Sequence, residues 1–183
     1  MTAETGLHST PEIAYRALAL LTVALKGEGL EQPLVERLVK QYGLASHFTP
    51  KELAFVENAA TSATEQTQFS WRYEAAWVLL WAMGYVDALA KPATICDVRK
   101  AVTVMKERTA EQFIAGVRIR PVAEVLDEAD LIYRYHWAVV DARVKNNPLP
   151  VGLDPDVIQE RHYALNWLIG HMDQGWDDVS TDT

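Results

Sequence analysis

The sequence predicts an all-α protein: a single globular domain of about seven to eight helices around a central Trp-rich helix, with an irregular acidic C-terminal tail. Helix-start signals recur along the 183 residues. Apolar residues between these signals follow the helical period. No run of alternating β-branched residues bounded by turn dipeptides predicts a strand. Helices alone therefore account for the pattern.

Composition supports one folded domain. Hydrophobic residues make up 49% of the chain and charged residues 23%, which is typical of a globular protein. No Gly/Ser linker, repeat or low-complexity tract divides the sequence. We therefore expect one helical domain over residues 1–183, with residues 1–9 flexible and residues 174–183 forming a non-helical tail.

Caps, prolines and glycines place the helices in order along the chain. The first helix begins after Ser9, with Pro11 in its first turn and Glu12 as the capping-box acid, and ends at Gly27. A long fourth helix is predicted to run from near Glu65 to Met83. The other predicted helices are Pro33–Tyr42, a short one from Pro50 with Thr49 as its cap, one capped by Asp97, one capped by Thr109, Pro121–Arg143 and Pro155–Ile169.

The net charge of −8 is unevenly distributed. The segment from Asp154 to Thr183 holds seven acids and one arginine, a net −6. Basic residues predominate between Val98 and Pro121, but Phe113 is the only aromatic residue among them. Because stacking on bases needs interleaved aromatics, we expect no nucleic-acid binding. The basic run is interpreted as a solvated face.

Three helices carry a polar residue where the helical projection, at about 100° per residue, places an apolar one. Glu74 falls within the aromatic arc of the fourth helix, His136 near the centre of the apolar face of the seventh, and Arg161 within that of the eighth. An unpaired buried charge costs several kcal/mol. We therefore predict that Arg161 is buried and pairs with Glu74 or with a tail acid, Asp177 or Asp178.

Two interpretations of this predicted network remain open. It either fixes the register of the helices or forms the floor of a pocket where pKa values are shifted for chemistry or binding. If it is a site, the catalytic candidates are His136, His162 and Asp178. The ligand-binding candidates are Arg72, Glu74, Arg134, Asp141, Arg161, Asn166 and Asp177.

Familiar catalytic and cofactor motifs are missing from the sequence. His162 and His171 lie on opposite sides of a helix, and neither HExxH nor a calcium-loop pattern occurs, so we expect no metal. The letters of Asp127–Asp130 match a helicase motif, but no phosphate loop accompanies them. Cys96 is the only cysteine, and no GxSxG elbow is present. No cofactor is expected.

Four stretches of the chain resemble a bacterial family known as domain of unknown function 4272. They are Tyr15–Leu21, Trp71–Trp81, Asp127–Arg143, and Glu160–Trp167 together with the closing WDDVSTDT. The resemblance implies a helical fold and implies no activity. It includes the residues selected by the helical projection, from Arg72 and Glu74 to Arg161 and Asp178.

These observations favour a non-enzymatic binding or regulatory module that acts through a protein partner, with the acidic C-terminal stretch as its contact or autoregulatory element. The alternative is an enzyme for a small anionic substrate, with His136 or His162 as acid or base and Arg161 holding the anion. The N-terminus lacks a signal peptide, and the longest apolar run, Ala75–Val86, is too short to span a bilayer. We therefore expect a cytoplasmic protein without a membrane partner; the oligomeric state is left open.

Overall fold

Residues 6–183 are described by a computed structural model, and they form α-helices joined by turns and loops, with no strand in that range. Two short 3₁₀ turns, His171–Asp173 and Trp176–Asp178, follow the last α-helix. The α-helices are α1 (Thr10–Gly27), α2 (Gln32–Tyr42), α3 (Pro50–Glu57), α4 (Ala63–Ser70), α5 (Arg72–Ala82), α6 (Val98–Lys106), α7 (Ala110–Ala115), α8 (Val122–Val144) and α9 (Pro155–Leu168). The predicted all-α, single-domain fold is confirmed.

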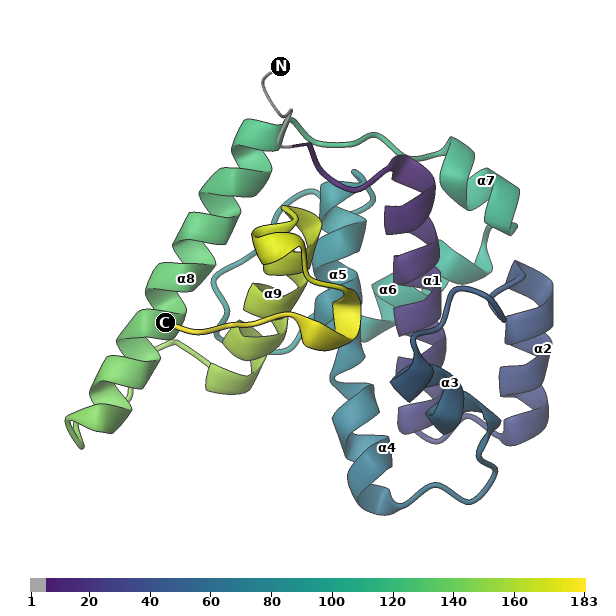
Figure 1. The fold of residues 1–183 in the computed structure, drawn as a ribbon, viewed down its shortest axis with the longest axis horizontal. Coiled ribbons are helices and arrows are strands. Elements are labelled where there is room, and N and C mark those ends of the chain that lie inside the picture. The colour runs from purple at the N-terminus through teal and green to yellow at the C-terminus, as the bar shows by residue number, and fades with distance from the viewer. Residues whose placement is uncertain (1–5) are drawn as a thin grey trace.

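The core lies between α1 and α5, which pack along each other (Figure 1). Both helices are buried on nearly all sides, as expected for helices that are apolar around most of their circumference. On one side α9 packs on α5, and α8 covers α9 at the outer edge of the molecule. On the other side α2, α3 and α4 surround α1. The Trp-rich helix is therefore central, as predicted, and shares that position with α1.

The predicted caps hold most of the helix starts. Thr49 accepts from the Glu52 amide at the start of α3, and Thr109 accepts from the Gln112 amide at the start of α7. Asp97 caps α6 through the amide of Lys100. Side-chain oxygens satisfy amide groups that a helix leaves unpaired, so these starts are readable from sequence. The capping box of Ser62 with Glu65, at the start of α4, was not predicted.

The prediction of one long fourth helix is wrong. The segment forms two helices, α4 and α5, that are separated at Trp71. No proline or glycine marks the break, and the backbone of Trp71 itself keeps right-handed helical angles. Packing causes it instead, because α4 lies on the end of α1 whereas α5 runs along α1 and α9. Sequence periodicity does not detect a break of this kind.

Both ends of the described chain pack on the domain. Residues 7–9 are not a loose lead-in: Leu7 packs on the core, and the ring of His8 stacks on Trp167 with centroids 4.0 Å apart. The first five residues of the expected flexible segment lie outside the described residues. In the C-terminal segment, Trp176 is buried within the short 3₁₀ turn. This indole packs against Tyr163 and Trp167 of α9, which holds the segment on the domain.

Candidate functional site

Glu74 and Arg161 meet inside the protein, as predicted. Glu74 lies in the first turn of α5 and Arg161 on α9, with side chains 2% and 5% exposed. The Arg161 Nε and Glu74 Oε2 atoms are 3.8 Å apart. Glu74 Oε1 accepts from the Cys96 amide at 2.5 Å, and Arg161 Nη1 donates to the Ala90 carbonyl at 2.5 Å. Of the proposed acidic partners, Glu74 is the one that pairs with Arg161.

Burial dominates the electrostatics of this cluster. It raises the pKa of the Glu74 carboxyl, while the Cys96 amide and the Arg161 guanidinium act in the opposite direction. Burial and the neighbouring Glu74 also raise the pKa of the Cys96 thiol. The thiol therefore stays protonated and is a poor nucleophile. The cluster is a charge pair that links two helices and a loop.

His136 and His162 form a second buried cluster between α8 and α9. Their Nδ1 atoms lie 2.7 Å apart, and the two rings are nearly perpendicular. Burial is the main reason that both pKa values are lowered, and the pKa of His162 falls to about 4. Near neutral pH both imidazoles are therefore uncharged, with one ring nitrogen donating to the other.

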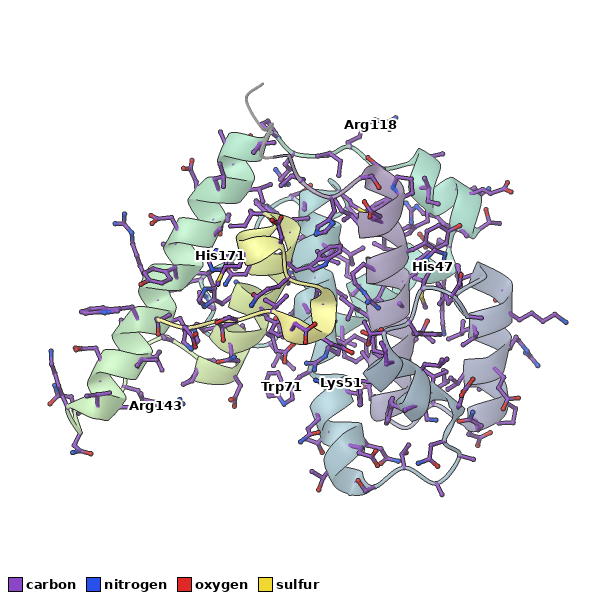
Figure 2. The ribbon with its side chains drawn as sticks, in the orientation of Figure 1. His47, Lys51, Trp71, Arg118, Arg143 and His171 are labelled. Carbon is purple, nitrogen blue, oxygen red and sulfur yellow. The ribbon has the colours of Figure 1, made fainter. Side chains whose placement is uncertain are left out.

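A groove of about 230 Å³ lies beside this histidine pair, between α8, α9 and the C-terminal segment. His162 and Asn166 line it with His171 and Asp182. Asn166 also donates to the Ser180 carbonyl, which holds the C-terminal segment against α9. In Figure 2, His171 lies in the region between the end of α9 and α8. The groove thus gathers imidazole, amide and carboxylate groups at the surface.

Arg161 does not face this groove. It lines a separate cavity of about 90 Å³ with Glu128, under the loop that contains Ala90. Adjacent residues on a helix diverge by about 100°, so Arg161 and His162 are directed to different sides of α9. Asp178 is exposed and lines neither space. The predicted enzyme site combining Arg161, His162 and Asp178 is therefore not assembled as one pocket.

The other candidates make local contacts. Arg72 pairs with Glu160 at 2.6 Å and joins α5 to α9. Arg134 pairs with Asp130 on the exposed face of α8. The remaining two contacts are Asp141 with Lys145, at 2.8 Å, and Asp177 with the backbone amide of Lys51, at 3.5 Å. Arg134 and Asp141 thus lie outside the buried network.

One flank of α8, beside the groove, carries exposed apolar residues. The helical projection groups Val122, Leu126 and Tyr133 with the apolar face of this helix, which predicts burial, but they are exposed. Together with Trp137 and Val144 they fall within an arc of about 60° at the helical repeat. The fractional exposure of these five side chains ranges from 39% to 75%. We call these five residues the α8 stripe.

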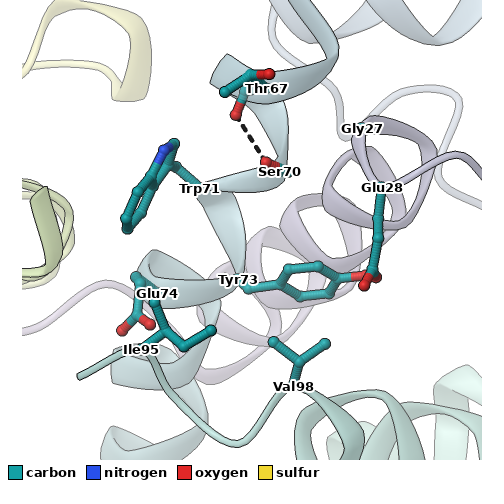
Figure 3. A pocket seen from close by; sticks show the side chains of 9 residues that line it. All are labelled: Gly27, Glu28, Thr67, Ser70, Trp71, Tyr73, Glu74, Ile95 and Val98. Carbon is teal, nitrogen blue, oxygen red and sulfur yellow. Dashed lines mark hydrogen bonds between the residues drawn. The ribbon is translucent and has the colours of Figure 1, made fainter.

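A cavity that the sequence does not predict lies where α1, α4, α5 and the start of α6 meet (Figure 3). Trp71, Tyr73 and Glu74 line it, and it has a volume of about 330 Å³. The aromatic and acidic residues around Trp71 are evident in the sequence. The break between α4 and α5, beside which the cavity lies, cannot be predicted from it.

Residues 6–183 contain no group of three or more His, Cys, Asp or Glu side chains placed to hold a metal ion. Within the same range, no helix has the length and apolar character needed to cross a membrane.

The fold and these clusters define a class: an all-helical, single-domain protein with polar pairs buried between α5, α8 and α9 and with an apolar stripe on its outer helix. The chain belongs to the family described as Domain of unknown function (DUF4272), whose family model matches residues 2–179. The resemblance found in the sequence is thus confirmed over nearly the whole chain. No curated protein and no solved structure matches it.

Proposed function

We propose that this protein is a cytoplasmic binding module that docks a basic, amphipathic helix of a partner protein on α8. The observation that carries this proposal is the α8 stripe. From Val122 to Val144 the stripe extends for about 33 Å, at about 1.5 Å per residue. Its aromatic members, Tyr133 and Trp137, are of the type that anchors protein interfaces. An apolar strip of this length matches the face that an amphipathic helix presents.

The charges beside the stripe favour a basic partner. The groove between the stripe and the C-terminal segment is lined by Asp130 and Asp182. Asp173, Asp178 and Asp182 are exposed, and none of them forms an ion pair with another described residue. A second copy of this chain would bring a charge of −8 toward a charge of −8. Charge complementarity therefore favours a partner that carries Lys or Arg beside its apolar face.

The enzymatic alternative finds less support in the geometry. An anionic substrate in the groove of His162 would meet the carboxylate of Asp182, and that of Asp130, which is already paired with Arg134, without the guanidinium of Arg161. With a pKa of about 4, His162 is also uncharged near neutral pH and adds no positive charge there. A small anion in this groove would thus lack the cation that the predicted chemistry uses to bind it.

Site-specific photo-crosslinking tests the proposal. The substitution Trp137→p-benzoylphenylalanine places a photoreactive group on the stripe, in cells that naturally make the protein. The matched control, Val151→p-benzoylphenylalanine, uses a side chain that is 94% exposed and lies in the loop after α8. We expect an adduct at position 137 and none at position 151. Mass spectrometry of the adduct should map a segment with an apolar helical face and a net positive charge.

The mapped segment, made as a peptide, then measures the energetics. Trp137→Ser should weaken its affinity by about tenfold or more, because an interface aromatic contributes about 2 kcal/mol. Val151→Ser should leave the affinity unchanged, and added salt should weaken binding. Attachment of a second copy of this chain, of an acidic segment, or of nothing at position 137 would each overturn the proposal.

A further inference from the structure

Arg161 presents a free donor to the cavity that it lines with Glu128. This cavity lies between α8, α9 and the loop that joins α5 to α6. Arg161 Nη1 donates to the Ala90 carbonyl, and Nε is enclosed beside Glu74. The remaining nitrogen, Nη2, has no hydrogen-bond partner among the described residues, and it is not enclosed as Nε is. One end of the guanidinium is therefore available to a ligand.

Glu128 supplies the opposite charge on the α8 side of the cavity. Its side chain is half-buried and forms no ion pair with Arg161 or with another described residue. Burial raises the pKa of its carboxyl, whereas the guanidinium of Arg161 acts in the opposite direction. A carboxylate and a guanidinium thus influence each other across the cavity without forming a salt bridge.

Hydrogen bonds fix the loop that forms one wall of this cavity. The Arg120 guanidinium donates to the Asp87 carbonyl at 2.7 Å, near one end of the loop. The Asp154 amide donates to the Pro92 carbonyl at 2.7 Å, further along the loop, and Arg161 holds the part between them. In Figure 1 the loop passes between α5 and α8. A preformed wall of this kind lowers the ordering cost of binding.

The charges around the cavity favour a ligand with no net charge. Arg161 and Glu74 carry opposite charges, as do Lys91 and Glu128, so the four groups sum to zero. A cation would be repelled by the guanidinium of Arg161, and an anion by the carboxylate of Glu128. An apolar ligand would desolvate both groups without pairing either. A ligand with two separated, opposite charges pairs both.

The size and lining of the cavity limit the ligand to a short carbon chain. A volume of about 90 Å³ is far below that of a drug-sized pocket but holds several water molecules. Ile132 of α8 and Leu165 of α9 are apolar and suit a carbon chain. Lys91 and Leu131 are exposed members of the lining, so the cavity is open to solvent at its rim.

We propose that this cavity binds a small zwitterionic amino acid, with its carboxylate at Arg161 and its ammonium group at Glu128. Charge-assisted hydrogen bonds at both ends fix the orientation of the ligand. At the helical repeat, Glu128 lies about 150° around α8 from the centre of the α8 stripe. The proposal is therefore independent of the docking of a partner helix, and failure of either one leaves the other standing.

Matched probes test the need for both charges. The intact, nitrogen-15-labelled protein is titrated with glycine, L-alanine and β-alanine, and with propionate and ethylamine, each of which lacks one charged group of alanine. We expect at least one amino acid to give saturable shifts of the amide signals of residues 89–91 and Glu128. Propionate and ethylamine should bind about tenfold more weakly or less. No binding of any amino acid, equal binding of propionate or ethylamine, or shifts confined to other residues would overturn the proposal.

A change of preference locates the ammonium group of the ligand. Glu128→Gln keeps the size of the side chain and removes its charge. We expect the affinity for the amino acid to fall by about tenfold and that for propionate to rise, because the repelling carboxylate is gone. The control Glu111→Gln removes an exposed charge on α7, away from the cavity, and should change both affinities by less than about twofold. Unchanged affinities in Glu128→Gln would place the amino acid elsewhere and overturn the site.

Discussion

The two buried histidines on α8 and α9 show how burial changes a single residue. His136 and His162 are hydrogen-bonded through their Nδ1 atoms, so only one of the facing nitrogens carries a proton. Protonating both rings would place two positive charges side by side in a desolvated space. This pair therefore couples the stability of the α8–α9 interface to pH.

The pKa of His162 predicts the direction of that coupling. Its pKa is about 4 in the folded protein and 6.5 as the reference value, so the unfolded chain binds the proton more readily. The stabilising contribution is fully present above about pH 6.5 and is lost as the pH falls toward about 4. The full loss corresponds to roughly 3 kcal/mol. Glu74 and Glu160 have raised pKa values and change stability in the opposite direction.

Urea unfolding from about pH 7.5 to about pH 4.5 measures this effect when the protein is compared with His162→Gln. The comparison cancels the carboxylate contributions that both proteins share. We expect the free energy of unfolding to decrease with acidification less steeply in the variant. Parallel curves for the two proteins would show that His162 is not held uncharged by the fold.

The cost of an unpaired buried charge made one contact between residues predictable from the sequence. Arg161 within an apolar arc required a partner, and Glu74 occupied the same kind of position on another helix, so their pairing was predictable. The directions of Arg161 and His162 relative to neighbouring helices depend on how α9 is rotated in the fold. Residue type alone therefore could not predict that Arg161 and His162 line two separate spaces.

At the scale of elements, the crossing of α1 and α4 depends on one glycine. Gly27→Ala would normally favour the helical state by about 1 kcal/mol. Here the added Cβ meets two backbone atoms at 2.6 Å, which cannot move aside as a side chain could. We expect a net loss of roughly 2 kcal/mol in the free energy of unfolding.

Thermal or urea unfolding of Gly27→Ala and Gly175→Ala checks this prediction. Gly175 has a φ of −67°, and a Cβ there would have its nearest contact at 3.9 Å. We expect the control to change stability by less than about 0.5 kcal/mol. A Gly27→Ala protein as stable as the control would show that α1 and α4 can separate without cost.

On α8, the helical period alone predicted that the whole apolar face is buried, and part of that face is exposed. A continuous apolar arc predicts burial, and His136 and Ile132 on this arc are indeed buried. The apolar arc is wider than the area that α9 covers, so Val122, Leu126 and Tyr133 remain exposed. Apolar surface that packing within the protein leaves exposed is available for an intermolecular contact.

At the scale of the whole molecule, the acidic C-terminal segment is a structural part of the domain. Trp176 is 6% exposed and contacts the rings of Tyr163 and Trp167 on α9. The Arg16 guanidinium of α1 lies 5.3 Å from the centroid of the Trp176 ring. The segment thus joins α1 and α9 through its indole.

Trp176→Ala should therefore lower the free energy of unfolding by about 4 kcal/mol, the usual cost of removing a buried tryptophan. Trp137→Ala removes the same side chain from the exposed stripe, where the fractional exposure is 52%, and should cost less than about 1 kcal/mol. Urea titration followed by circular dichroism compares them. Equal losses would mean that the C-terminal segment is not anchored by Trp176.

The sequence alone determined most of the helices, most of their caps, the central position of the Trp-rich segment and the Glu74–Arg161 pair. These features depend on local hydrogen bonding, helical period and the cost of an unpaired buried charge, all of which act through residue type and spacing. Only the tertiary structure decided the break at Trp71, the exposure of the α8 stripe and the burial of Trp176. Those outcomes depend on which surfaces neighbouring helices cover, and the area that one helix covers on another is set by the packing of the whole chain.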